Sequence, residues 1–250
     1  MSLSRNKLFI IVLSLLGGWP AFSAESKLSA NQILSKVDDT VNAPRDQEIK
    51  ATITLVDRDG KEKQRQLVIT QKGSDRRMAK FLSPADQKGI AFLSLPDDVT
   101  YLYLPAFGKT RRIASHVKNT KFAGTDFSYE DMEAKRFSRK FTPVLVKDDS
   151  TSYTLELTPK KDAVSDYSKI VMQVGRESFI PLRMDLYDKS GKLSKIATQE
   201  KIEKISGYWT ALKSTMEDKK ENHRTIMSQT ETKFDQNLSD DRFTERYLAK

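Results

Sequence analysis

The sequence of 250 residues has no cysteine and only two histidines, His116 and His223. Without cysteine the chain cannot form a disulfide framework, a thiolate metal site or a catalytic thiol, and it cannot carry a lipid on an N-terminal cysteine. Two histidines far apart in the sequence argue against a multi-histidine metal centre. The motifs G-x-G-x-x-G, G-x-x-x-x-G-K-[ST], H-E-x-x-H and G-x-S-x-G are also missing. We therefore expect no cofactor, no metal and no catalytic residue.

Long apolar runs are missing too, apart from a short one near the N-terminus. Residues 8–16 are almost entirely apolar, follow two basic residues and precede the small residues Ala21 and Ser23. This run is too short to cross ~30 Å of hydrocarbon comfortably. The pattern predicts a cleaved signal peptide over residues 1–23 and a periplasmic protein, with residues 24–250 forming a single domain.

One amphipathic helix opens this expected domain. Apolar residues recur at helical spacing from Leu28 to Val41, and Asn42-Ala43-Pro44 ends the pattern. Ser29 is suited to cap the helix, with Gln32 as its partner three residues later.

After Pro44 the hydrophobic period changes to two, which is typical of half-buried strands. Turn signals such as Asp59-Gly60 and Ser190-Gly191 separate about ten or eleven strands, mostly joined as hairpins. The pairs Asp97-Asp98 and Asp148-Asp149 lie where turns are needed, so we assign them to turns and not to acid–base catalysis. A long antiparallel meander closes into a barrel, splits into a sandwich or curls around another element.

Residues 105–135 interrupt the strands with a loop-rich, aromatic segment that is too long for a plain connection. The charge around it is uneven, because the formal charge is +9 and neither 99–125 nor 134–147 contains an acidic residue. Basic residues interleaved with aromatic ones suit single-stranded nucleic acid, an amphiphile with an acidic head, or an ordinary solvated face over a core. Because an exported protein rarely meets nucleic acid, we expect no nucleic-acid partner.

Three stretches give the sequence a family resemblance. They are the opening helix with Ser29-Ala30-Asn31-Gln32-Ile33-Leu34; the middle motif with Tyr101-Leu102-Tyr103-Leu104-Pro105, Lys109-Thr110-Arg111-Arg112-Ile113 and Gly124-Thr125-Asp126-Phe127-Ser128-Tyr129-Glu130-Asp131; and the tail Phe243-Thr244-Glu245-Arg246-Tyr247-Leu248. Together they resemble the outer-membrane lipoprotein-sorting proteins of bacteria, which are related in fold to the LolA/LolB carriers.

The resemblance implies a mainly β fold with a few helices. Its strongly curved antiparallel sheet is an unclosed half-barrel, and helices cover the concave face. It also implies an apolar cavity for lipid or for the acyl chains of a lipoprotein, and it suggests association with an inner-membrane RND-type exporter. The opening helix and residues 105–135 are the lid candidates, and Arg111 and Arg112 could hold the lid or meet an acidic headgroup. The candidate ligand-binding residues are Phe92, Tyr101, Tyr103, Phe107, Arg111, Arg112, Phe122, Phe127, Tyr129 and Met132.

Three functional hypotheses follow from these patterns. The first is a periplasmic carrier of lipid-like or lipoprotein acyl cargo. The second is a non-catalytic adaptor that docks on an RND-type exporter through its basic face. The third is an enzyme that uses the cavity through Asp126 or His116, which the missing motifs disfavour. Alternation leaves open whether Trp209 faces the cavity.

Overall fold

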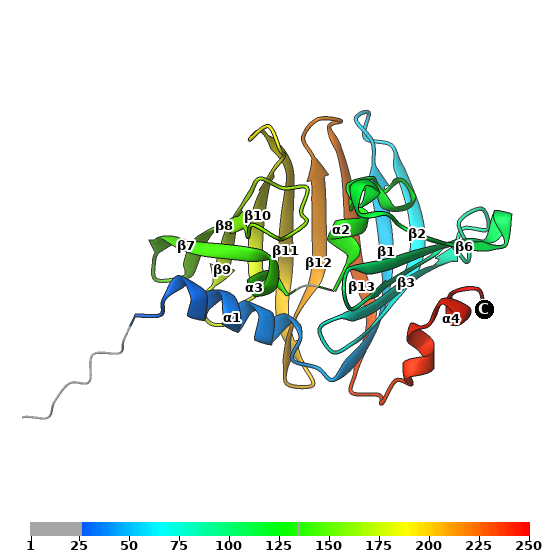
Figure 1. Cartoon of the computed structure of the whole chain (residues 1–250), viewed down its shortest axis with the longest axis horizontal. Coiled ribbons are helices and arrows are strands. Elements are labelled where there is room, and N and C mark those ends of the chain that lie inside the picture. The colour runs from blue at the N-terminus through cyan, green and yellow to red at the C-terminus, as the bar shows by residue number, and fades with distance from the viewer. Residues whose placement is uncertain (1–26, 135) are drawn as a thin grey trace, which may run out of the picture.

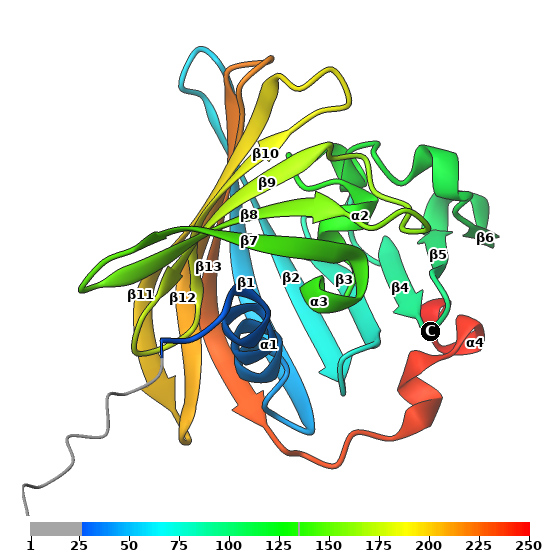
Figure 2. The same ribbon diagram turned by 60° about the vertical axis from the view of Figure 1, so that its left-hand side comes forward.

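The computed structural model describes residues 27–134 and 136–250, so the expected signal peptide lies outside the described residues. None of the helices in these two ranges is long and apolar enough to cross a membrane. Within them, thirteen strands form a single antiparallel sheet in the order β6-β5-β4-β3-β2-β1-β13-β12-β11-β10-β9-β8-β7. The expected mainly β, unclosed and curved sheet is confirmed (Figures 1 and 2).

The secondary structure alternates long hairpins with short helical segments. The strands are β1 (Asp46–Val56), β2 (Glu62–Lys72), β3 (Arg76–Ser83), β4 (Ala91–Leu95), β5 (Val99–Leu104), β6 (Lys109–Arg112), β7 (Phe141–Asp148), β8 (Ser152–Pro159), β9 (Lys169–Gly175), β10 (Pro181–Tyr187), β11 (Leu193–Ile205), β12 (Tyr208–Asp218) and β13 (His223–Phe234). The helices are α1 (Ala30–Val41), α2 (Tyr129–Met132), α3 (Phe137–Lys140) and α4 (Glu245–Leu248), with 3₁₀ turns η1 (Pro105–Phe107), η2 (Ser115–Val117), η3 (Phe122–Gly124) and η4 (Asp240–Phe243).

The strand order explains where the middle of the chain must run. All sheet neighbours are consecutive in sequence except β1 and β13, so the sheet consists of two meanders joined at that pair. Strands β6 and β7 therefore lie at opposite edges of the sheet. The connection between them, residues 113–140, has to cross the whole sheet, and its helices α2 and α3 lie within the curve (Figure 1).

Helix α1 begins and ends where the sequence predicts. The Ser29 hydroxyl accepts a hydrogen bond from the Gln32 backbone N–H, and the Gln32 side chain accepts one from the Ser29 N–H, which completes the capping box. Ile33, Leu34 and Val37 are fully buried. They pack the helix onto strands β7 to β12 and α3.

Two separate hydrophobic clusters fill the concave side. One joins α1 to strands β7–β12 and includes the fully buried Leu155, Leu157 and Met172. The other joins strands β1–β5 to the crossing segment, where the ring of Phe122 lies 5.5 Å from that of Phe81 and 5.7 Å from that of Phe92. Each half of the sheet is thus covered by its own segment, α1 on one half and residues 113–134 on the other.

A third cluster lies on the opposite face of the sheet. Along β4, Phe92 belongs to the concave cluster, whereas its neighbours Ala91 and Leu93 face the other way. The tail covers them with Phe243 and Leu248, so α4 packs beside β4 and β5 outside the curve (Figure 2).

Two features differ from expectation. The structure has thirteen strands rather than ten or eleven, and one of these, β6, lies inside the segment expected to be loop. Its residues are polar on both faces because it is an exposed edge strand, so no alternation marks it. In addition, Lys118 and Lys121 do not belong to a solvated basic face, because both form ion pairs with carboxylates of the same structure.

Candidate functional site

A cavity of about 280 Å³ lies between the two concave clusters. Its walls come from both halves of the sheet, for example Ile49 and Ile69 from one half and Ile170 and Leu186 from the other. Phe127 packs against both clusters and also lines the cavity. More of the lining residues are aliphatic or aromatic than polar, as in sites for apolar ligands.

The structure brings some of the candidate ligand-binding residues to this cavity. Phe122, Phe127 and Met132 line it. Phe92 and Tyr129 lie directly behind this wall, since their rings are 6.1 Å apart and both pack around Phe122. These five residues form one continuous aromatic and apolar wall.

The other candidate residues lie elsewhere. Tyr101 and Tyr103 pack with the C-terminal tail on the opposite face of the sheet. Phe107 is 64% exposed beside β6, and the guanidinium of Arg111 lies 6.0 Å from the centre of its ring. Arg111 and Arg112 are exposed on that edge strand and are not among the residues lining the cavity.

Trp209 lies in the cavity wall, which answers the question left open by strand alternation. It stands near the start of β12, and the Lys204 ammonium lies 4.6 Å from the centre of its ring.

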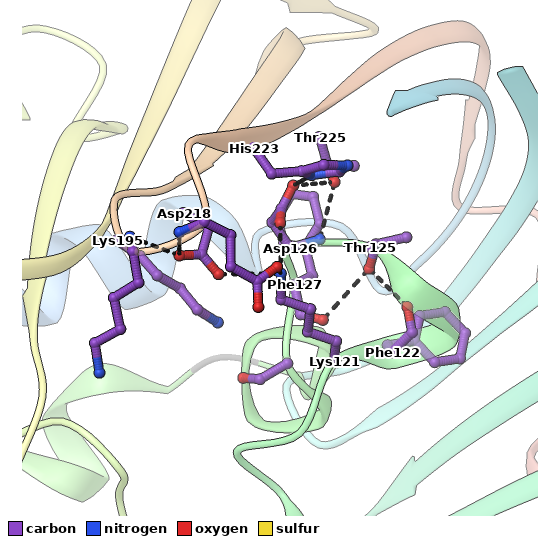
Figure 3. A network of polar contacts seen from close by, with 12 residues as sticks. Lys121, Phe122, Thr125, Asp126, Phe127, Lys195, Asp218, His223 and Thr225 are labelled. Atoms are coloured by element: carbon purple, nitrogen blue, oxygen red, sulfur yellow. Dashed lines mark hydrogen bonds and ion pairs between the residues drawn. The ribbon is translucent and has the colours of Figure 1, made fainter. Parts of the chain in front are cut away.

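Asp126 anchors the crossing segment to the hairpin between β12 and β13 (Figure 3). Its carboxylate is fully buried and accepts a hydrogen bond of 2.7 Å from the Thr225 hydroxyl, and His223 Nδ1 lies 2.6 Å from the same oxygen. The Asp126 N–H donates to the Thr225 hydroxyl in return. The Thr225 hydroxyl donates to the carboxylate and not to a histidine nitrogen, which differs from the order nucleophile–histidine–carboxylate of a catalytic triad.

Lys121 completes this network with three carboxylates. Its ammonium lies 3.1 Å from Asp126 Oδ1 and 3.0 Å from Asp218 Oδ2, and it also pairs with Glu221. Burial alone would lower the pKa of Lys121, but hydrogen bonds to the three carboxylates raise it above its usual value. The ammonium therefore stays charged and holds the crossing segment against the sheet.

Two further carboxylates fasten the same segment at other points. Asp131 accepts hydrogen bonds from the Tyr167 hydroxyl at 3.0 Å and from the Lys195 ammonium, also at 3.0 Å. Burial and the nearby negative charges raise the pKa of Tyr167, which keeps its hydroxyl protonated as a donor. Glu133 pairs with Lys118 and with Lys140, whose Nζ lies 3.0 Å from Glu133 Oε2. Asp131 thus holds the segment to β11 through Lys195, and Glu133, which also accepts a hydrogen bond of 3.2 Å from the Thr100 hydroxyl, holds it to β5 in the other half of the sheet.

Asp38 joins the two covering segments to each other. It lies in α1 and is 3% exposed. Its two oxygens accept hydrogen bonds of 2.7 Å from the Phe137 N–H and 2.9 Å from the Ser138 N–H. These are the first backbone groups of α3, so one carboxylate caps α3 from a different helix.

The sequence alone did not predict that Asp126, Asp131 and Asp38 hold the covering segments, nor that Arg77 and Lys140 line the cavity. The signal for Asp126 and Asp131 was that both stand in the middle motif, where acidic residues return after a long basic stretch. Asp38 gave a signal as a carboxylate on the apolar face of α1, beside Val37. Among residues 27–134 and 136–250, no group of three or more histidine, aspartate or glutamate side chains is placed to hold a metal ion.

Comparisons with known proteins agree with this architecture. A DUF1329 family protein from Desulfovibrio piger is 29% identical, with a TM-score of 0.82 over 88% of this chain and 97% of that one. A domain from Vibrio parahaemolyticus named for outer membrane lipoprotein sorting is 24% identical, with a TM-score of 0.79 over 87% of this chain and 98% of that one. A LolA superfamily protein from Nitrosomonas europaea is 22% identical, with a TM-score of 0.74 over 88% of this chain and all (100%) of that one.

No curated protein matches the chain. A family model whose description reads "-like: Uncharacterized protein" matches residues 73–250, which include the whole crossing segment and both sheet edges. The resemblance drawn from the sequence is confirmed: the chain belongs to the family of this model, and its fold is that of the LolA superfamily of outer-membrane lipoprotein-sorting proteins.

Proposed function

We propose that the protein is a non-enzymatic periplasmic carrier that holds a lipid-like molecule or the acyl chains of a lipoprotein in the cavity. One observation carries the proposal: an apolar cavity lies between two separately packed halves of a sheet, under segments that are fastened by polar contacts. The names of two structural neighbours, which refer to lipoprotein sorting and to the LolA superfamily, support it.

The driving force would be removal of apolar surface from water. Each CH₂ group gains about 0.8 kcal/mol on burial, so a chain of a dozen carbons gains on the order of 10 kcal/mol before ordering costs are subtracted. The covering segments are held by apolar packing outside the cavity and by charged and hydrogen-bonded anchors such as Asp126, Asp131 and Asp38.

The test is the state of the protein taken from its own periplasm. Native mass spectrometry should show a bound amphiphile, and a fluorescent acyl probe should bind the emptied protein. Ala197 lies in the cavity wall, so Ala197→Phe should weaken probe binding, whereas the matched change Ala85→Phe at an exposed position should not. Protein that is always empty and binds no acyl probe would contradict the carrier function.

A second candidate is a non-catalytic adaptor of an inner-membrane RND-type exporter. It is favoured by the exposed edge strand β6, where Lys109, Arg111 and Arg112 stand beside the exposed ring of Phe107. Charge reversal at Arg111 and Arg112 should then abolish capture of the exporter from envelope extracts, while acyl-probe binding stays unchanged. Capture that is insensitive to the reversal would count against the adaptor.

A further inference from the structure

One edge of the cavity is marked by a row of polar side chains that crosses several strands. The strand register places Gln47 opposite Gln71, Gln71 opposite Arg77, Arg77 opposite Ser94, and Ser94 opposite Thr100. Successive cross-strand partners share one face of a sheet, so the five side chains form a single transverse row.

The next row on the same face is entirely apolar. Two residues further along each strand, the same register aligns Ile49, Ile69, Ala79, Phe92 and Leu102. Of the two rows, Gln47, Arg77, Ile49 and Ile69 line the cavity directly. The cavity wall therefore changes from aliphatic to polar over two residues of each strand. This arrangement matches an amphiphile that lies along the strands, with its head at the polar row.

Arg77 is the charged member of the polar row. Its Nε donates to Gln71 Oε1 at 2.8 Å, and its Nη1 donates to the Glu133 carbonyl at 3.3 Å. Within residues 27–134 and 136–250, no carboxylate forms an ion pair with it. A guanidinium has five N–H groups, so the contacts to Gln71 and Glu133 leave donors for a ligand. Burial lowers the pKa of Arg77 to about 10, which leaves it charged at neutral pH.

Several of the other charged groups that line the cavity form ion pairs, and the buried carboxylate of Glu130 accepts a hydrogen bond from the Asp166 N–H. Lys140 pairs with Glu133 and Asp98, and Asp131 pairs with Lys195. Arg136 is a second arginine of the wall, exposed at the start of α3, three positions after the carbonyl that Arg77 contacts. Both arginines of the cavity wall thus stand close to Glu133, one in space and one in the chain.

We propose that this polar row, with Arg77 as its central group and Arg136 beside it, binds the anionic headgroup of the cargo, a phosphate or a carboxylate. The inference rests on the carrier function proposed above and adds the substrate class, an acidic amphiphile. Planar guanidinium groups match the geometry of both anions and can bind them through two parallel hydrogen bonds. The acyl chain then lies along Ile49 and Ile69 toward the interior.

The test compares amphiphiles that have the same chain and different heads. Dodecyl phosphate, dodecanoate and dodecanol are titrated into the emptied protein below their micellar concentrations, with inorganic phosphate as a headgroup without a chain. Charge-assisted hydrogen bonds are worth about 1.5–3 kcal/mol, so both anionic amphiphiles should bind roughly tenfold or more tightly than dodecanol. Inorganic phosphate should not compete at millimolar concentration.

The variants assign the preference to the proposed residues. Arg77→Gln should remove most of the preference by weakening the binding of the two anionic amphiphiles. Arg136→Gln, at an exposed position where folding is not at risk, should reduce the preference in part. Lys80→Gln is the matched control, because it removes one positive charge from the same strand. Its neighbours in sequence, Ala79 and Phe81, belong to the concave cluster, so alternation places the Lys80 side chain on the opposite face of the sheet.

Four results would overturn the inference. If wild type binds dodecanol as tightly as dodecyl phosphate, or if neither Arg77→Gln nor Arg136→Gln changes the preference, the headgroup site is wrong while the carrier function stands. If inorganic phosphate competes fully, the site is an anion site without a role for the chain. If no amphiphile binds wild type, the carrier function fails and the headgroup site fails with it.

Discussion

The hydrogen bonds from Asp38 to α3 give the sharpest prediction about how the cavity cover is held. In Asp38→Asn one acceptor oxygen is replaced by an amide NH₂ group. That group cannot accept the N–H of either Phe137 or Ser138, and it faces one of them as donor against donor. Both the lost bond and the buried N–H left without an acceptor then destabilise the protein.

The magnitude follows from the geometry. A hydrogen bond to a charged acceptor contributes about 1.5–3 kcal/mol, and an orphaned buried donor costs a similar amount, so we expect a loss of roughly 2–4 kcal/mol. In a chain of this size, 1 kcal/mol shifts the melting temperature by about 2–4 °C, so the midpoint should fall by roughly 5–15 °C.

The assay is thermal and urea unfolding followed by circular dichroism, with Asp39→Asn as the control. Asp39 is the next residue of α1, has the same charge and is exposed. The reasoning is refuted if the two variants unfold within about 1 °C of each other, because the carboxylate of Asp38 would then contribute no more than a surface charge.

Three further predictions concern the tail, the sheet surface and the cavity wall. Leu248→Ala should cost about 2–5 kcal/mol in unfolding experiments, because Leu248 is fully buried against the outer face of the sheet, whereas Leu82→Ala on the exposed part of β3 should cost far less. Hydrogen bonds from two lysines lower the pKa of Glu231 to about 2, so its contribution to stability is present above pH 4.5 and is lost as the pH falls toward 2. Glu231→Gln should therefore make the free energy of unfolding depend less on pH over that range, and an unchanged pH dependence would refute the assignment. The emission of Trp209 should shift to the blue when an acyl probe binds, because this residue lies in the cavity wall. Unchanged emission with the probe bound would mean that the acyl chain binds outside the cavity.

The elements set by local pattern could be predicted closely from the sequence. The capping box at Ser29, the apolar face of α1 and the hairpin at Asp59-Gly60 depend on neighbouring residues, and all appear as expected. Strand alternation also predicted an antiparallel meander. The polar edge strand β6 was not predicted, because its residues do not alternate between apolar and polar.

The site was harder to predict because it is built from residues far apart in the chain. Aromatic content drew attention to Phe122 and Phe127, which line the cavity. The same signal marked Tyr101 and Tyr103, which alternation places on the outer face under a tail about 140 residues away. Arg77 belongs to the cavity only because β3 pairs in register with β2. In the sequence Lys121 belongs to a basic stretch, because its partner Asp218 is distant in the chain and lies beside it only in the folded structure.

The two separately packed halves of the concave side have a mechanical consequence. The two clusters meet at β13, which contributes only the partly buried Met227 to one of them, and the backbone hydrogen bonds that join β13 to β1 and β12 tolerate a range of twist. A small change in twist there widens or narrows the space between the clusters while each cluster keeps its own contacts. The range of cargo sizes that the cavity accepts would then depend on how far the twist of the three central strands can change. A substitution that stiffens them should narrow the range of chain lengths accepted, even if no cavity-lining side chain is altered.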